Sequence, residues 1–136
     1  MPAFIRRKLI RFHHCDPAGI VFYPQYFILF NELVEDWFAE GLDLPFGELH
    51  VNQRLGTPTA HIECKFMGPS RVDDLLDFAL AVTSIGTSSI NLAVSVSKDF
   101  TERLVARQTL VLVSLDTMKS LPIPDDLRAR LETFKP

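Results

Sequence analysis

Four side chains that could bind a metal or move a proton stand in a row near the N-terminus. They are His13, His14, Cys15 and Asp16, followed by a Pro-Ala-Gly run. Adjacent residues cannot easily converge on one ion, and a spaced pattern such as His-x-x-x-His is missing here. The cluster therefore does not predict a metal site. It points instead to chemistry that a single carboxylate can perform.

Asp16 stands just before a segment in which Tyr23 and Pro24 have the character of a first helical turn. Free N–H groups at a helix start, together with the helix dipole, can stabilise an oxyanion. A carboxylate facing a carbonyl polarised in this way is a workable acyl-transfer site. Alternatively, Asp16 only caps the turn before Pro17, because Asp-Pro is a common turn opener. Cys15 has no suitably spaced base, so we interpret it as a small buried residue.

A long amphipathic helix must hold this segment in place. Apolar side chains step by three or four residues from Tyr23 to Phe38, and Gly41 is typical of a helix end. A first strand is predicted before it, from Phe4 to Phe12, and residues 13–22 are predicted to form a loop. The segment from Pro45 to His50 is expected to add one short helical turn.

Strand patterns dominate after Pro58. Residues from Ala60 to Phe66 alternate apolar and polar, as a half-buried strand does. Three β-rich runs separated by short turns follow, so neighbours should pair antiparallel: Leu75 to Ile85, Ser89 to Phe100 and Arg103 to Leu115. A terminal helix is predicted from Asp125 to Phe134. One helix on one five-stranded sheet is an α+β domain spanning residues 1–136. Its uncovered face and free edges favour oligomerisation.

Composition narrows the class of protein. The chain has 136 residues, a net charge of −3, 47% hydrophobic residues and 23% charged residues. This balance does not favour binding to nucleic acid or to an anionic membrane. We find no signal peptide, no membrane span, no P-loop, no Gly-x-Gly-x-x-Gly and no Gly-x-Ser-x-Gly. With two cysteines and no Cys-x-x-Cys, we expect free thiols and a cytoplasmic location.

The run from Cys15 to Tyr26, Cys-Asp-Pro-Ala-Gly-Ile-Val-Phe-Tyr-Pro-Gln-Tyr, closely resembles the active-site segment of 4-hydroxybenzoyl-CoA thioesterases. These enzymes belong to the hotdog-fold acyl-CoA thioesterases. The later Gly56-Thr57-Pro58 also matches, and the order of elements agrees along residues 5–120. The resemblance implies a hotdog fold, in which an antiparallel five-stranded sheet wraps around a long central helix.

The resemblance also implies roles for particular residues. Asp16 matches the catalytic carboxylate, which attacks the thioester carbonyl or activates water. Tyr23 matches the position whose backbone N–H binds the thioester oxygen. Thr57 lies beside the acyl group in such enzymes, and Lys119 matches a basic residue that contacts the nucleotide. Sites in this family lie between subunits of a dimer, often assembled into a tetramer.

Three positions depart from the family pattern. Asn31 aligns with an acidic residue that faces the aryl hydroxyl in the hydroxybenzoyl enzymes. Uncharged Ser88 and Ser89 fall where a basic pair meets the CoA phosphates, so Arg71 or Arg103 would have to supply the charge. His14 replaces an acidic residue of the loop, where its imidazole could shift the pKa of Asp16.

Together these features predict a thioester hydrolase that acts on an acyl- or aryl-CoA without metal or redox cofactor, as a homodimer or homotetramer. Asp16 and Tyr23 are the catalytic candidates, and His14, Asn31, Thr57 and Lys119 are the substrate-binding candidates. The alternatives are an acyl-thioester binder that does not hydrolyse its ligand and a thioesterase directed to acyl carrier protein.

Overall fold

Helix α1 (Tyr23–Asp36) forms where the sequence places apolar side chains on one face. That face is buried: Leu29, Phe30, Leu33 and Val34 are at most 4% exposed. The helix widens into a π-helical turn (Trp37–Gly41) and ends at the predicted glycine. A second short helical turn covers Gly47–Asn52, slightly later than predicted. The computed structural model describes residues 3–136.

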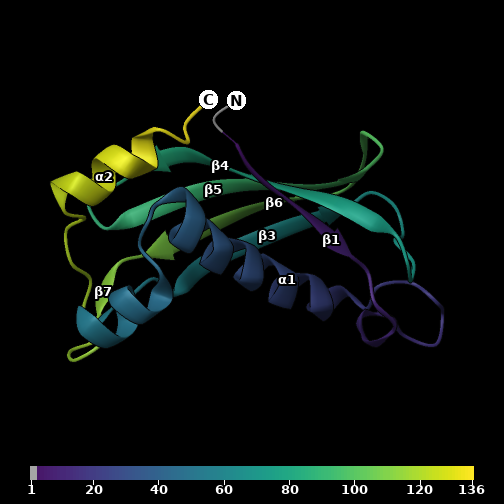
Figure 1. Ribbon diagram of the computed structural model, residues 1–136, viewed down its shortest axis with the longest axis horizontal. Helices are drawn as coiled ribbons and strands as arrows, with labels where there is room; N and C mark the ends of the chain where they lie inside the picture. Colours follow the sequence, from purple (N-terminus) through teal and green to yellow (C-terminus); the bar gives the residue numbers. More distant parts are fainter. Residues whose placement is uncertain (1–2) are drawn as a thin grey trace.

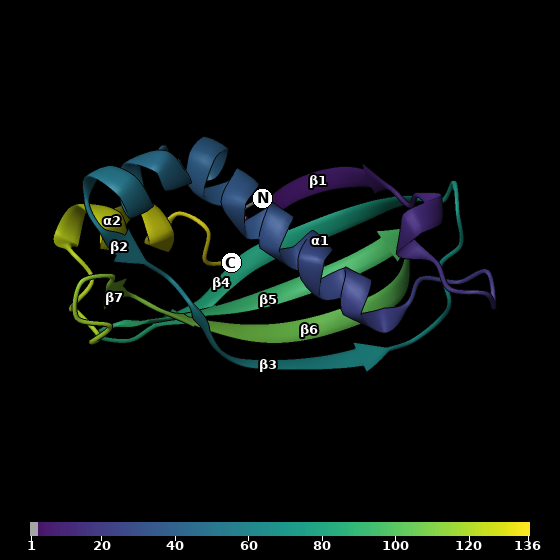
Figure 2. The same ribbon diagram turned by 90° about the horizontal axis from the view of Figure 1, so that it is seen from below.

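A five-stranded antiparallel sheet curves around α1 in the order β1-β4-β5-β6-β3 (Figures 1 and 2). The strands are β1 (Phe4–Leu9), β3 (Thr59–Phe66), β4 (Leu75–Ile85), β5 (Ser89–Lys98) and β6 (Thr101–Val111). The α+β class and the antiparallel pairing of β4, β5 and β6 are confirmed. Strands β1 and β3 form the two edges of the sheet.

The core lies between α1 and one face of the sheet. Along β4 and β5, every second side chain is buried against the helix, whereas the alternate side chains point to the uncovered face. Helix α2 (Asp125–Glu132) closes one end of the core through Leu127 and Leu131. Among residues 3–136, no helix combines the length and apolar character needed to cross a bilayer.

Three predicted boundaries were wrong. The first strand stops at Leu9, because the chain turns into a 3₁₀ turn at Phe12–His14 in which the Arg11 N–H donates to His14 Nδ1. Strand β6 begins at Thr101, because Asp99 and Phe100 alone make the hairpin turn, both with positive φ. The run to Leu115 is interrupted before β7 (Val113–Ser114), which pairs with the unpredicted β2 (Leu55–Gly56) in a second small sheet.

Candidate active site

The Asp16 loop, residues 15–21, is closed by its own backbone. The Asp16 N–H donates to the Ile20 carbonyl at 3.0 Å, and the Gly19 N–H donates back to the Asp16 carbonyl at 2.9 Å. Gly19 has φ +80°, a conformation that only glycine adopts without cost. The Ala18 N–H donates to Asp16 Oδ1 at 2.9 Å. Asp16 therefore does cap the turn, but only one of its two carboxylate oxygens has this role.

Two neighbouring segments hold the Asp16 loop. On one side, the Phe22 N–H donates to the His14 carbonyl at 2.9 Å. On the other, the Val21 N–H donates to the Ser70 carbonyl at 2.8 Å, and Ile20 bridges to Arg71. The carboxylate is thus presented by a loop whose position is set by main-chain hydrogen bonds.

A partly buried ionic cluster surrounds Asp74, in the segment that follows Arg71. Asp74 pairs with Lys98 at 2.8 Å and with Arg103 at 3.5 Å, and the Arg71 N–H donates to Asp74 Oδ2 at 2.9 Å. Burial opposes the charge of Asp74, but these partners hold its pKa below the usual value. The Arg103 guanidinium also donates to the Pro69 carbonyl. Arg103 is therefore committed to structure, whereas Arg71 is exposed beside the loop.

The start of α1 offers a single free backbone donor. Pro24 has no N–H, and the Gln25 N–H donates to the Phe22 carbonyl at 2.9 Å. The Tyr23 N–H has no acceptor among residues 3–136. The Tyr23 ring is 59% exposed and packs edge-on to Phe22. The helix dipole reinforces this donor, so the site can stabilise negative charge on an oxygen placed there.

Cys15 is not a convincing nucleophile. Burial raises the pKa of its thiol, and the neighbouring charge of Asp16 raises it further. Because the thiolate is the reactive form, this environment favours the packing role predicted from the sequence.

A cleft of about 270 Å³ lies further along α1, and it brings Asn31 and Thr57 together. Thr57 comes from the link between β2 and β3. Asn31 lies on α1, eight residues after Tyr23, which is about 12 Å along the helix axis. Tyr23, Phe27 and Asn31 form an exposed row at four-residue steps that leads from the helix start to the cleft. None of the side chains lining the cleft is an acid, a lysine or an arginine.

Gln108 lines the same cleft and was missed from the sequence. It is 6% exposed and lies on the α1 side of β6, in line with Leu104, Ala106 and Leu110. Its Nε2 donates to Thr59 Oγ1 at 2.9 Å, but its Oε1 is buried without a partner among residues 3–136. An unpaired buried acceptor costs about 1–3 kcal/mol. The apolar alternation along β6, interrupted once by glutamine, is the signal that could have identified it.

The other two predicted binding residues lie away from this cleft. The His14 ring is 6% exposed and lines a separate small cleft with Lys8, His13 and Glu32. Burial lowers the pKa of His14, and so does the charge of His13. Lys119 is exposed in the turn after β7. Figure 1 shows β7 and the start of α1 at opposite ends of the molecule. Within one chain, Lys119 and Asp16 are not brought together.

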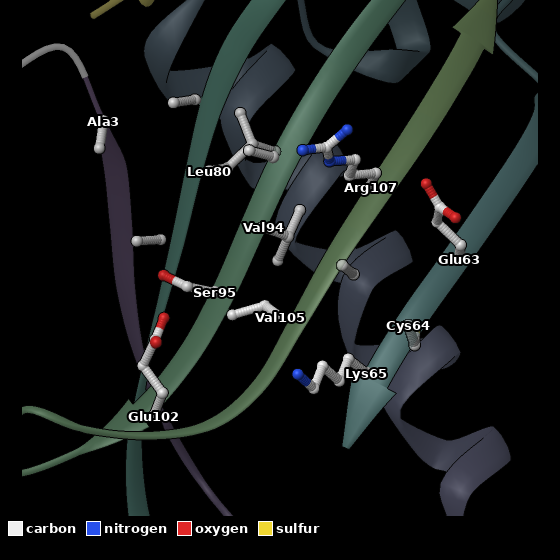
Figure 3. A pocket seen from close by; sticks show the side chains of 14 residues that line it. Ala3, Glu63, Cys64, Lys65, Leu80, Val94, Ser95, Glu102, Val105 and Arg107 are labelled. Atoms are coloured by element: carbon white, nitrogen blue, oxygen red, sulfur yellow. The ribbon is translucent and has the colours of Figure 1, made fainter. Parts of the chain in front are cut away.

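A hollow of about 630 Å³ lies on the uncovered face of the sheet and contains none of the predicted site residues. Small side chains form its floor, among them Ala79, Ala81 and Ala93. Figure 3 shows Glu63 on β3 beside Arg107 on β6, with Lys65 further along β3 near Val105. This hollow offers neither a free helix start nor the Asp16 carboxylate. No group of three potential metal ligands occurs among residues 3–136.

An antiparallel five-stranded sheet wrapped around one long helix is the hotdog fold. Residues 10–131 match the model of the Thioesterase-like superfamily, and the chain belongs to this family. The structure resembles that of a thioesterase superfamily protein from Jannaschia sp. CCS1, with a TM-score of 0.90 and 30% identity, over 98% of this chain and 94% of that one.

Two relatives carry more specific names. The 1,4-dihydroxy-2-naphthoyl-CoA hydrolase of Thermosynechococcus vestitus is 26% identical over 93% of this chain and 87% of its own length. The 1,4-dihydroxy-2-naphthoyl-CoA thioesterase from Synechocystis has the same fold, with a TM-score of 0.85 and 19% identity over 95% of each chain.

Proposed function

We propose that this protein hydrolyses an acyl-CoA thioester to a free acid and CoA, without metal or redox cofactor. Asp16 is the nucleophile or general base, and the Tyr23 N–H donates to the thioester oxygen. The observation that carries the proposal is the pairing of a loop-borne carboxylate with the only unoccupied N–H of the first three positions of α1. Removing one donor of this kind typically costs about 3 kcal/mol of transition-state stabilisation.

Two routes satisfy this geometry. In one, an Asp16 oxygen attacks the thioester carbonyl carbon, the C–S bond breaks, CoA leaves as a thiolate that takes up a proton, and water hydrolyses the resulting anhydride. In the other, Asp16 takes a proton from water as that water attacks, then returns it to the leaving sulfur. In both, negative charge develops on the carbonyl oxygen, which the Tyr23 N–H faces.

The carrier and the acyl group are proposed from separate observations. The names of the curated relatives support CoA as the carrier and an aromatic acyl group as a candidate. Arg71 is exposed beside the Asp16 loop, where it can meet a phosphate of CoA. Both cysteines are free thiols, which fits a reducing cytoplasm.

A second copy of the chain would complete the site. Strand β3 is an edge of the sheet, and Phe66 at its end is 50% exposed beside the exposed rings at the start of α1. Pairing β3 with the β3 of another copy would satisfy this edge and cover these apolar groups. A tetramer would use the uncovered sheet face, where charges of both signs around the hollow allow a self-complementary contact.

The test is release of thiol from a panel of aryl-, short-, medium- and long-chain acyl-CoAs by wild type and Asp16→Asn. Asparagine can still accept the Ala18 N–H, so the loop keeps its shape while the anion is lost. We expect hydrolysis by wild type and a loss of about a thousandfold in the variant. A blank without substrate corrects for Cys15 and Cys64.

Unchanged turnover in Asp16→Asn would reject the mechanism. Binding of acyl-CoA by wild type without thiol release would identify a non-hydrolytic binder. If no acyl-CoA binds or reacts, CoA is the wrong carrier, and thioesters of acyl carrier protein replace it in the same assay.

A further inference from the structure

The loop that connects β3 to β4 passes close to the start of α1 (Figure 2). Arg103 on β6 holds this loop at four consecutive residues. Its carbonyl accepts the N–H groups of Met67 at 2.9 Å and Gly68 at 3.2 Å. Its guanidinium donates to the Pro69 carbonyl and to Ser70 Oγ, the latter at 3.4 Å. The position of Ser70 is therefore fixed by the sheet.

Ser70 is 1% exposed although it lies in a loop, and both its main chain and its side chain are used. Its carbonyl accepts the Val21 N–H at 2.8 Å. Burial raises the pKa of the Tyr26 phenol, and a hydrogen bond from the Ser70 hydroxyl offsets part of the rise. Since a serine hydroxyl has one hydrogen and two lone pairs, it can accept from the Arg103 guanidinium and donate to this phenol together.

The two contacts of Ser70 fall on either side of Tyr23. Val21 is two residues before it, at the end of the Asp16 loop, and Tyr26 is three residues after it, in the first turn of α1. We propose that Ser70 is a positioning residue that fixes the distance between the Asp16 carboxylate and the Tyr23 N–H. Its main chain anchors the loop, and its side chain anchors the helix. This inference rests on the proposed function, because the distance matters only if both groups act on one carbonyl.

The charge of Arg103 does not depend on Ser70. The Asp74 carboxylate lies 3.5 Å from the guanidinium, and Lys98 pairs with the same carboxylate at 2.8 Å. With the Pro69 carbonyl as a further acceptor, the guanidinium is satisfied without the hydroxyl. Loss of the hydroxyl therefore acts on the helix start. Because a shift of about 1 Å in a reacting group can cost on the order of a hundredfold in rate, even a small displacement is measurable.

The test combines kinetics with a measurement that needs no turnover. Ser70→Ala keeps the carbonyl that binds Val21, and we expect kcat for an acyl-CoA that wild type hydrolyses to fall about tenfold with little change in KM. Tyr26→Phe removes the partner of the same bond, so it should lose a similar factor, and the double variant should lose no more than the larger single loss. Amide hydrogen exchange at Gln25, whose N–H donates to Phe22, should be about fivefold faster in both single variants.

Thr109→Val is the matched control, because it removes another partly buried hydroxyl, whose Oγ1 donates to Asn91 Oδ1 at 2.7 Å on the uncovered face of the sheet. It should keep the wild-type kcat and the wild-type exchange at Gln25. Wild-type kcat and exchange in Ser70→Ala and Tyr26→Phe, an equal loss in Thr109→Val, or fully additive losses in the double variant would overturn the assignment. Faster exchange in both variants without hydrolysis of any thioester by wild type would reject the proposed function alone and leave Ser70 as the residue that joins the loop to the helix.

Discussion

The two ends of the proposed acyl site are built by different means. At the start of α1, backbone groups of one continuous segment make the geometry: the turn around Asp16, the bond from Phe22 to His14 and the free Tyr23 N–H. In the cleft, side chains from distant segments converge, among them Asn31, Thr57 and Gln108. Under the proposed function, the first end would act on any thioester, whereas the second would distinguish one acyl group from another.

This difference predicts different effects of substitution on hydrolysis. Asp16→Asn should lower kcat/KM by about a thousandfold for every acyl-CoA tested, because all substrates share the carbonyl. Asn31→Leu should change the ranking of substrates and affect most of them by less than tenfold. Initial rates over the acyl-CoA panel measure both. A uniform loss in Asn31→Leu would show that the cleft takes part in the chemistry itself.

The backbone-defined end should be sensitive to conformational strain. Gly19→Ala places a side chain at φ +80°, which should lower the free energy of unfolding by about 1 kcal/mol. Open space surrounds the added methyl group, so strain is the only cost. Gly47→Ala is the matched control, because its methyl group also meets open space but its φ is not positive. Urea denaturation should show a lower stability for the first variant only.

In the cleft, by contrast, a substitution should raise the free energy of unfolding. Gln108→Leu removes a buried acceptor that has no partner, and Thr59 is exposed enough to find water instead. We expect the free energy of unfolding to rise by about 1 kcal/mol, measured by urea denaturation. A decrease would mean that the bond between Gln108 and Thr59 outweighs the unpaired oxygen.

The smallest effect concerns pH. Burial lowers the pKa of His14 in the folded protein, so below about pH 6.5 the unfolded chain binds the proton more readily. Stability should therefore decrease as pH falls from about 6.5 toward the lower folded pKa. His14→Asn keeps an acceptor for the Arg11 N–H and should remove this decrease, whereas exposed His13→Asn should reduce it only in part, because burial is the larger cause of the lowered pKa of His14. Urea midpoints at pH 7.5 and 5.5 provide the measurement.

Much of the fold could be predicted because it follows from local pattern. The period of the apolar residues placed α1, and alternation bounded by turns placed β4 at Leu75–Ile85. The pair β2 and β7 was missed because two-residue strands carry no periodicity. Likewise, the Asp16 segment could be recognised as a motif in the sequence. Identifying Gln108 as a cleft residue requires knowing which face of β6 meets α1. The catalytic roles of Asp16 and Tyr23 stay predictions.

Pro24 has a consequence for how this enzyme can change under mutation. If the oxyanion donor belongs to the main chain, replacing the Tyr23 side chain removes its ring contacts with Phe22 and Phe66 but leaves the donor in place. Among the twenty amino acids, only proline lacks the donor, and proline is well suited to the first position of a helix. Tyr23→Pro would therefore remove the backbone N–H donor from a helix start that still accepts the new residue. No other substitution at position 23 removes this donor.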